Sequence, residues 1–75
     1  MDLDAAEEKM LRAIVQTAVV EAAAGRSFAG KFRDYTISAA CLQVNEQGVA
    51  QVEARILHAT GPVIQIERGW VLAQR

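Results

Sequence analysis

The fold is decided in residues 21–33, EAAAGRSFAGKFR, where the spacing of the apolar residues changes. Before Gly25, apolar residues recur every three or four positions, which is typical of one face of an α-helix. After this stretch, apolar and polar residues alternate in three runs separated by short turns with glycine, and such alternation is typical of β-strands. The sequence therefore predicts an α+β fold, in which one N-terminal helix packs on a three-stranded antiparallel β-meander.

Two local signals bound the helix. Asp4 and Glu7 have the spacing of a capping box, in which each side chain accepts a hydrogen bond from the backbone N–H of the other residue. Gly25 follows the last helical residues, where glycine readily adopts the left-handed conformation that ends many helices. We expect a single domain over residues 1–75, made of a helix over about 4–24, a basic loop over 25–33, and strands over about 34–44, 49–59 and 63–73.

The composition indicates a small domain that needs a partner to cover its apolar surface. The chain has 75 residues, of which 52% are apolar, and a domain this short has little interior in which to bury them. Its formal net charge of −1 provides no general attraction to nucleic acid or to an anionic membrane. We therefore expect the chain to associate first with a second copy of itself, and otherwise with another protein.

The cysteine content and the N-terminus bear on the compartment. The single cysteine, Cys41, excludes an intramolecular disulfide and a zinc site built on paired cysteines. Residues 1–4, MDLD, are acidic where a secretory signal would be basic. The most apolar stretch falls short of the roughly 20 apolar residues that a membrane-spanning helix needs. We expect a cytoplasmic protein that does not contact the membrane.

The two later turns predict the register of the sheet. If each is a three-residue loop, position 45 faces 49 and position 59 faces 63. The side chains of one sheet face, which we expect to pack against the helix, would then be Leu42, Val44, Ala50, Val52, Ala54, Ile56, Ile64, Ile66, Trp70 and Leu72. The first strand has apolar residues at both parities. Either both of its faces are covered, or a β-bulge near Ala40 shifts the parity.

Two groups of residues are left over once this core is made. The first is a line of small residues along the helix, which indicates either alanine's preference for helices or a contact with a second protomer. Val20 favours the contact, because a β-branched residue would not be chosen there for helix propensity. The second is an apolar patch at one end of the outer sheet face. The candidate oligomer interface is therefore Ala13, Thr17, Val20 and Ala24 on the helix, and Tyr35, Ile37, Leu57 and Val63 on the sheet.

The sequence offers no catalytic constellation. Cys41 and His58 are the only residues of their kinds, and in the predicted register they project from opposite sides of the sheet, so they do not form a nucleophile–base pair. A lone histidine has no second one with which to bind a metal. We therefore predict no catalytic residue, no metal site and no cofactor.

The loop over 25–33 has two interpretations. It begins with the spacing of a phosphate-binding loop, but Phe32 stands where a serine or threonine would hold magnesium, and a strand follows the loop instead of a helix. The remaining pattern interleaves cations with aromatic rings, which is typical of surfaces that grip single-stranded nucleic acid. Alternatively, the rings close the open end of the core. The candidate nucleic-acid contacts are Arg26, Phe28, Lys31, Phe32 and Arg33.

Together these patterns favour a non-enzymatic protein-interaction or assembly module that acts as a homo-oligomer. The alternative is a single-stranded nucleic-acid-binding module that uses residues 26–33. A third hypothesis, a small-ligand carrier or enzyme subunit with its site between protomers, also stays open, because one chain cannot reveal a site that two chains share.

Overall fold

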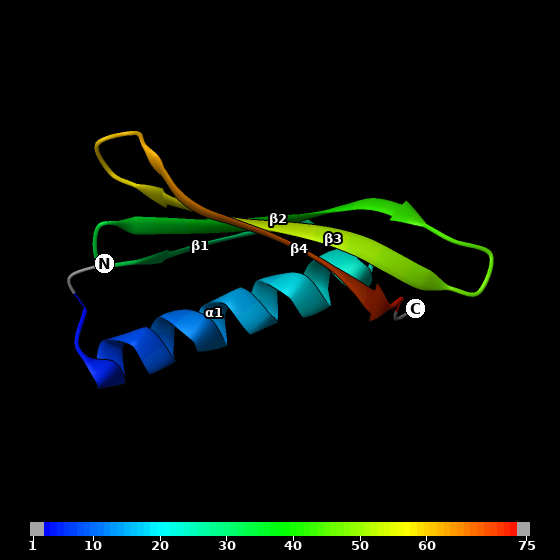
Figure 1. Cartoon of the computed structure of the whole chain (residues 1–75), viewed down its shortest axis with the longest axis horizontal. Helices are drawn as coiled ribbons and strands as arrows, with labels where there is room; N and C mark the ends of the chain where they lie inside the picture. The colour runs from blue at the N-terminus through cyan, green and yellow to red at the C-terminus, as the bar shows by residue number, and fades with distance from the viewer. Residues whose placement is uncertain (1–2, 74–75) are drawn as a thin grey trace.

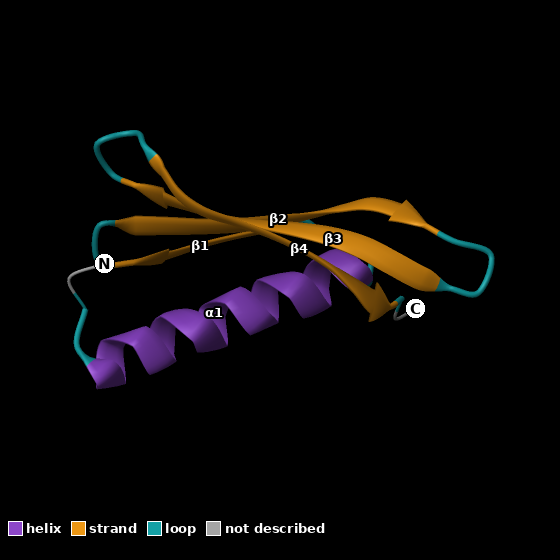
Figure 2. Ribbon diagram, viewed as in Figure 1, coloured by secondary structure: helices purple, strands orange, loops and turns teal. Residues whose placement is uncertain are grey.

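The computed structural model describes residues 3–73, which form one helix and a four-stranded antiparallel sheet (Figures 1 and 2). The strands follow one another as a meander in the order β1-β2-β3-β4, and the helix lies against one face of the sheet. The α+β class is confirmed, but the sheet has four strands instead of three. Residues 1, 2, 74 and 75 of the predicted domain lie outside the described residues. The elements are α1 (Ala5–Ala23), β1 (Phe28–Phe32), β2 (Tyr35–Val44), β3 (Val49–His58) and β4 (Val63–Leu72).

Both predicted helix ends are confirmed. The Glu7 N–H donates to Asp4 Oδ1 (2.8 Å), and the Asp4 N–H donates to Glu7 Oε1 (3.3 Å), which completes the capping box. At the other end Gly25 has a φ of 83°. The N–H groups of Gly25 and Arg26 donate to carbonyls of the last turn, at 3.0 and 2.9 Å, in a Schellman arrangement. The helix therefore ends where its sequence signals place it.

The prediction of a basic loop over 25–33 is wrong, because most of this segment is strand β1. Phe28, Gly30 and Phe32 point toward the helix while the residues between them are exposed, which is the alternation of a strand covered on one face. A two-residue turn with Arg33 at a φ of 52° leads directly into β2. The turn contains no glycine, so the sequence lacks the usual hairpin signal there.

The core lies between α1 and the central strands, and small residues dominate it. Four buried helix residues pack against six buried residues of β2 and β3, and α1 contacts these two strands more than β4. Alanines on both sides let the helix approach the sheet closely. The buried residues are Leu11, Ala18, Ala22 and Ala23 on the helix, and Ile37, Ala39, Ala50, Val52, Ala54 and Ile56 on the sheet.

We expect Gly30→Ala to destabilise the fold while Gly69→Ala does not. A Cβ on Gly30 would lie 2.9 Å from Phe28 Cε1 and 3.3 Å from Ile14 Cγ2, whereas a Cβ on Gly69 meets nothing within 4 Å. Overpacking of this kind costs about 1–3 kcal/mol. Adding a methyl group without strain stabilises by about 0.4–1 kcal/mol, because it restricts the unfolded chain. Urea unfolding of both variants measures the difference, and equal midpoints would contradict the close packing of α1 on β1.

The register predicted for β2 and β3 is correct near the turn that joins these strands, and it then changes. Val44 pairs with Ala50 as expected, but a β-bulge between Cys41 and Gln43 shifts the pairing by one residue. Beyond the bulge, Ile37 pairs with Ile56, and both are buried beneath the helix. The second interpretation of β2, a bulge that changes the parity, is therefore correct. Leu42, predicted to lie in the core, is at the bulge and is 49% exposed.

The register predicted for β3 and β4 is wrong by one residue. The side chains of β4 that were expected on the helix side of the sheet therefore lie on the opposite side. Position 56 was expected to face 66, but Ile56 pairs with Gln65, with an irregularity where the strand leaves the turn. The tight turn causes the shift: the His58 N–H donates to the Pro62 carbonyl (3.0 Å), and Gly61 adopts a φ of 109°. A one-residue slip moves every side chain to the other face. Four residues predicted for the core are consequently exposed: Ile64, Ile66, Trp70 and Leu72.

Candidate functional site

The structure leaves the predicted helix line accessible. Ala13 and Thr17 are exposed, Val20 is 42% exposed, and Ala24 is half-buried. The Thr17 hydroxyl donates to the Ala13 carbonyl (3.0 Å), so this polar group is satisfied within the helix. The line therefore presents mainly apolar surface, and its contact with a second protomer stays a prediction.

The predicted apolar patch on the sheet does not form. Ile37 is fully buried in the core, and Tyr35, two residues earlier on the same side of β2, also packs against the core. Leu57 follows the buried Ile56 and therefore points to the opposite face, where it pairs with the exposed Val63. The bulge in β2 explains the error, because it exchanges the faces of the residues that precede it.

The residues proposed for nucleic-acid contact do not share one surface. Phe28 and Phe32 are half-buried against the core, whereas Lys31, between them in β1, is exposed on the other face. Arg26 pairs with Glu21 at 2.5 Å, and Arg33 pairs with Glu7. The hydrogen bond from Arg26 lowers the pKa of Glu21. The rings therefore take the second role considered for them, covering the core, and two of the three cations are already paired.

Cys41 and His58 stand on the same side of the sheet, contrary to the expected opposite sides, but far apart. His58 lies opposite Tyr35, with its ring edge-on at 5.4 Å, and its Nδ1 is 2.8 Å from the Thr60 hydroxyl. Cys41 is six residues from Tyr35 along β2, a separation of roughly 20 Å at 3.3 Å per residue. Within residues 3–73, no group of three histidine, cysteine or carboxylate side chains is arranged to hold a metal ion.

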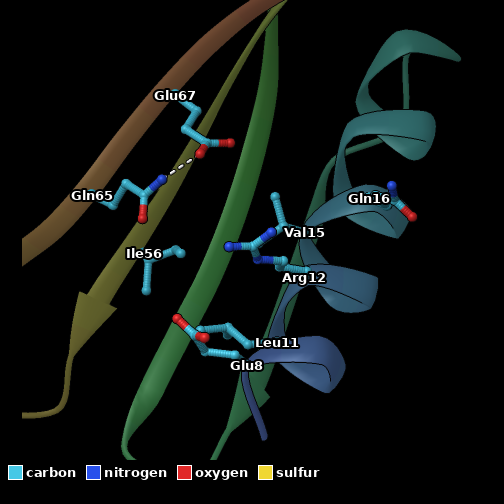
Figure 3. A pocket seen from close by; sticks show the side chains of 8 residues that line it. All are labelled: Glu8, Leu11, Arg12, Val15, Gln16, Ile56, Gln65 and Glu67. Carbon is cyan, nitrogen blue, oxygen red and sulfur yellow. Dashed lines mark hydrogen bonds between the residues drawn. The ribbon is translucent and has the colours of Figure 1, made fainter. Parts of the chain in front are cut away.

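A groove of about 370 Å³ lies between α1 and β4 (Figure 3). It exists because β4 presents Gln65 and Glu67 to the helix in place of apolar residues, and the Gln65 amide donates to the Glu67 carboxylate. Arg12 extends from the helix toward the sheet across this space. The lining combines an apolar floor with charged and amide walls: Leu11, Val15 and Ile56, and Glu8, Arg12, Gln16, Gln65 and Glu67.

The other face of β4 carries a row of exposed side chains. Ile66 is 49% exposed, Trp70 is 55% exposed and Leu72 is 70% exposed, with Arg68 at the same parity between them. We call these four residues the β4 row. Ile64, at the irregular start of the strand, adds a further exposed apolar side chain. The helix packs on the opposite face of the sheet, so it does not cover the row (Figure 2).

Arg68 belongs to a charged cluster in the middle of this face. Glu53 of β3 accepts a hydrogen bond from Arg55 Nε and another from Arg68 Nε, both at 2.7 Å. The two arginines lower the pKa of Glu53 and cover it, so that Glu53 is only 8% exposed. Glu53 therefore offsets part of the combined charge of Arg55 and Arg68 within the protomer.

The sequence contains a signal for the β4 row in the position of Arg68. Arg68 has the same parity as Ile66 and Trp70, whereas Gly69 lies on the other parity. A charged residue at the centre of a row is more easily placed on the open face than beneath a helix, because burial of a charge is costly. The position of Arg68 thus indicates that Ile66 and Trp70 lie on the open face of the sheet, as they do in the structure.

The chain matches no family model, no curated protein and no solved structure. The helix formed within residues 3–73 is not both long and apolar enough to span a membrane. A function for this protein therefore has to be inferred from the geometry of the described residues.

Proposed function

We propose that the protein is a non-enzymatic association module that acts as a homo-oligomer, with the β4 row as its contact surface. The observation that carries this proposal is the line of large apolar side chains on an uncovered face of an edge strand. Single exposed apolar residues are ordinary on protein surfaces, but several large ones gathered along one strand favour an interaction site, even with Arg68 among them.

A second copy of the chain is the simplest partner for such a row. Two copies related by a two-fold axis bring the same residues into contact, so each apolar side chain meets another. Burial of apolar surface contributes roughly 25 cal/mol per Å². The ion pair with Glu53 lessens the repulsion between the two copies of Arg68, although Glu53 also pairs with Arg55. The helix line around Val20 is a second accessible surface, on the other side of the molecule.

We expect the protein to have at least twice its 8.1 kDa chain mass at high micromolar concentration. Multi-angle light scattering measures this mass. Trp70 is the only tryptophan, so its fluorescence emission should shift to shorter wavelengths as concentration rises and the row becomes covered.

Val20→Glu serves as the matched control, because it places a charge on the helix line and leaves the β4 row unchanged. We expect this variant to keep the mass of the parent. A parent that remains an 8.1 kDa monomer at these concentrations would remove the basis of the proposed function.

A further inference from the structure

Within residues 3–73 no strand pairs with the outer edge of β4, and this edge exposes its hydrogen-bonding groups at alternate residues. The Ala73 N–H donates to the Gly48 carbonyl (2.8 Å), which makes this a hydrogen-bonded pair of the β3–β4 ladder. In an antiparallel ladder such pairs recur every two residues, so residues 65, 67, 69 and 71 direct their N–H and C=O groups toward β3. The residues of the β4 row direct theirs away from the sheet. The same four residues thus carry the exposed side chains and the free backbone groups.

From Gln65 to Leu72, this edge lacks most of the features that usually prevent strands from pairing, and its charged residues are Glu67 and Arg68. β4 has ten residues, contains neither proline nor lysine, and its register with β3 is regular from Gln65 to Leu72. Proteins commonly protect such edges with proline, lysine, bulges or short strands. The opposite edge, β1, has only five residues and includes Lys31. Pairing is therefore favoured at β4.

We infer that β4 of one copy pairs antiparallel with β4 of a second copy, across a two-fold axis perpendicular to the sheet. This inference rests on the proposed function and specifies its geometry. The two sheets become one sheet of eight strands, and both helices lie on the same face, because directly opposed residues of antiparallel strands point to the same side.

The side chains of the β4 row select one register. When Arg68 faces Arg68 of the second copy, Ile66 faces Trp70 of that copy, and residues 64–72 of both strands overlap. This contact between Ile66 and Trp70 occurs twice, once on each side of the axis. The two central guanidinium groups are each held by their own Glu53 at 2.7 Å, and because that carboxylate also pairs with Arg55, it offsets part of the positive charge at the axis.

Neighbouring registers are less favourable. The two strands can slide past each other only in steps that keep both helices on the same face of the sheet. Each such step moves the two-fold axis by one residue, from Arg68 to Glu67 or to Gly69. A shift in one direction places Glu67 against Glu67 of the second copy and replaces the contact of Ile66 with Trp70 by a contact of Ile66 with Arg68. A shift in the other direction shortens the overlap to residues 66–72 and leaves Ile64 without a partner.

Disulfide trapping tests this register. In a Cys41→Ala background, we expect Arg68→Cys to form a covalent dimer under mild oxidation, because facing residues of a hydrogen-bonded pair have Cα atoms about 5.5 Å apart, within disulfide reach. Leu72→Cys is the matched control: in this register it lies eight residues from its own copy across the axis, roughly 27 Å away, and should not crosslink. Crosslinking at Leu72 but not at Arg68 would overturn the inference.

Amide hydrogen exchange tests the same pairing without any substitution. In the associated parent, we expect the amides of Ile66, Arg68 and Trp70 to exchange as slowly as those of Gln65 and Glu67, and on the order of 100-fold faster once the sample is diluted to monomer. If the parent associates while these three amides exchange rapidly, the edge pairing is wrong and the proposed function stands. If the parent is monomeric, both fail.

Discussion

Ile37→Ala should lower the free energy of unfolding by about 2–5 kcal/mol, the largest effect we expect from a single truncation. Ile37 of β2 is fully buried beneath the helix, beside its partner Ile56 of β3, so its removal leaves a cavity that neighbouring side chains fill only in part. The cost combines lost burial with the cavity. Urea or thermal unfolding of the variant at low concentration, where the protein is monomeric, measures it.

Leu42→Ala is the matched control for the bulge in β2. Leu42 lies at the bulge and is 49% exposed, so we expect its truncation to change stability by less than about 1 kcal/mol. Without the bulge, Leu42 would be in the core and Ile37 on the surface. A large loss for Leu42→Ala together with a small loss for Ile37→Ala would therefore show that the parity of β2 is the opposite of the one described.

Trp70→Ala should weaken self-association by about a thousandfold while leaving the protomer folded. Roughly half of the Trp70 surface is exposed in the protomer, and covering about 80–100 Å² of it contributes about 2 kcal/mol. Each copy supplies one Trp70, so the dimer loses about 4 kcal/mol, which is close to a factor of 10³ in Kd. Sedimentation or light scattering over a dilution series measures the change, and circular dichroism reports the fold.

Trp70→Phe distinguishes the loss of apolar surface from the loss of a particular residue. Phenylalanine keeps most of the apolar area, so this variant should associate within about tenfold of the parent. If Trp70→Ala associates as tightly as the parent, the β4 row is not the contact surface. The alternative contact surface would then be the helix line around Val20, which the structure also leaves exposed.

Sequence patterns predicted the elements more reliably than the faces of the strands. The capping box at Asp4 and the glycine at Gly25 act locally, so the bounds of α1 follow from a few neighbouring residues. β1 was missed because five residues with one glycine provide little alternation, and the turn at Arg33 has no glycine to mark it. Its role depends on contacts with α1 and β2 that no local pattern reveals.

The faces of β2 and β4 depend on single residues in the ladder. The apolar residues at both parities of β2 indicated a bulge as one of two interpretations, and the structure shows it between Cys41 and Gln43. For β4, the apolar alternation was taken to require burial, although the turn before Val63 sets the register. An alternating strand fits either face of a sheet when only one face is covered, and the turn geometry decides between them.

The shortness of β1 limits how far an assembly built on β4 can grow. Once two copies are joined at β4, the strand edges that stay free among the described residues are the two copies of β1, each five residues long. A head-to-tail contact between β1 and β4 would propagate into a filament, whereas the two-fold contact consumes both long edges at once. The difference in length between the first and last strands thus makes a closed pair the natural end point and disfavours fibrils.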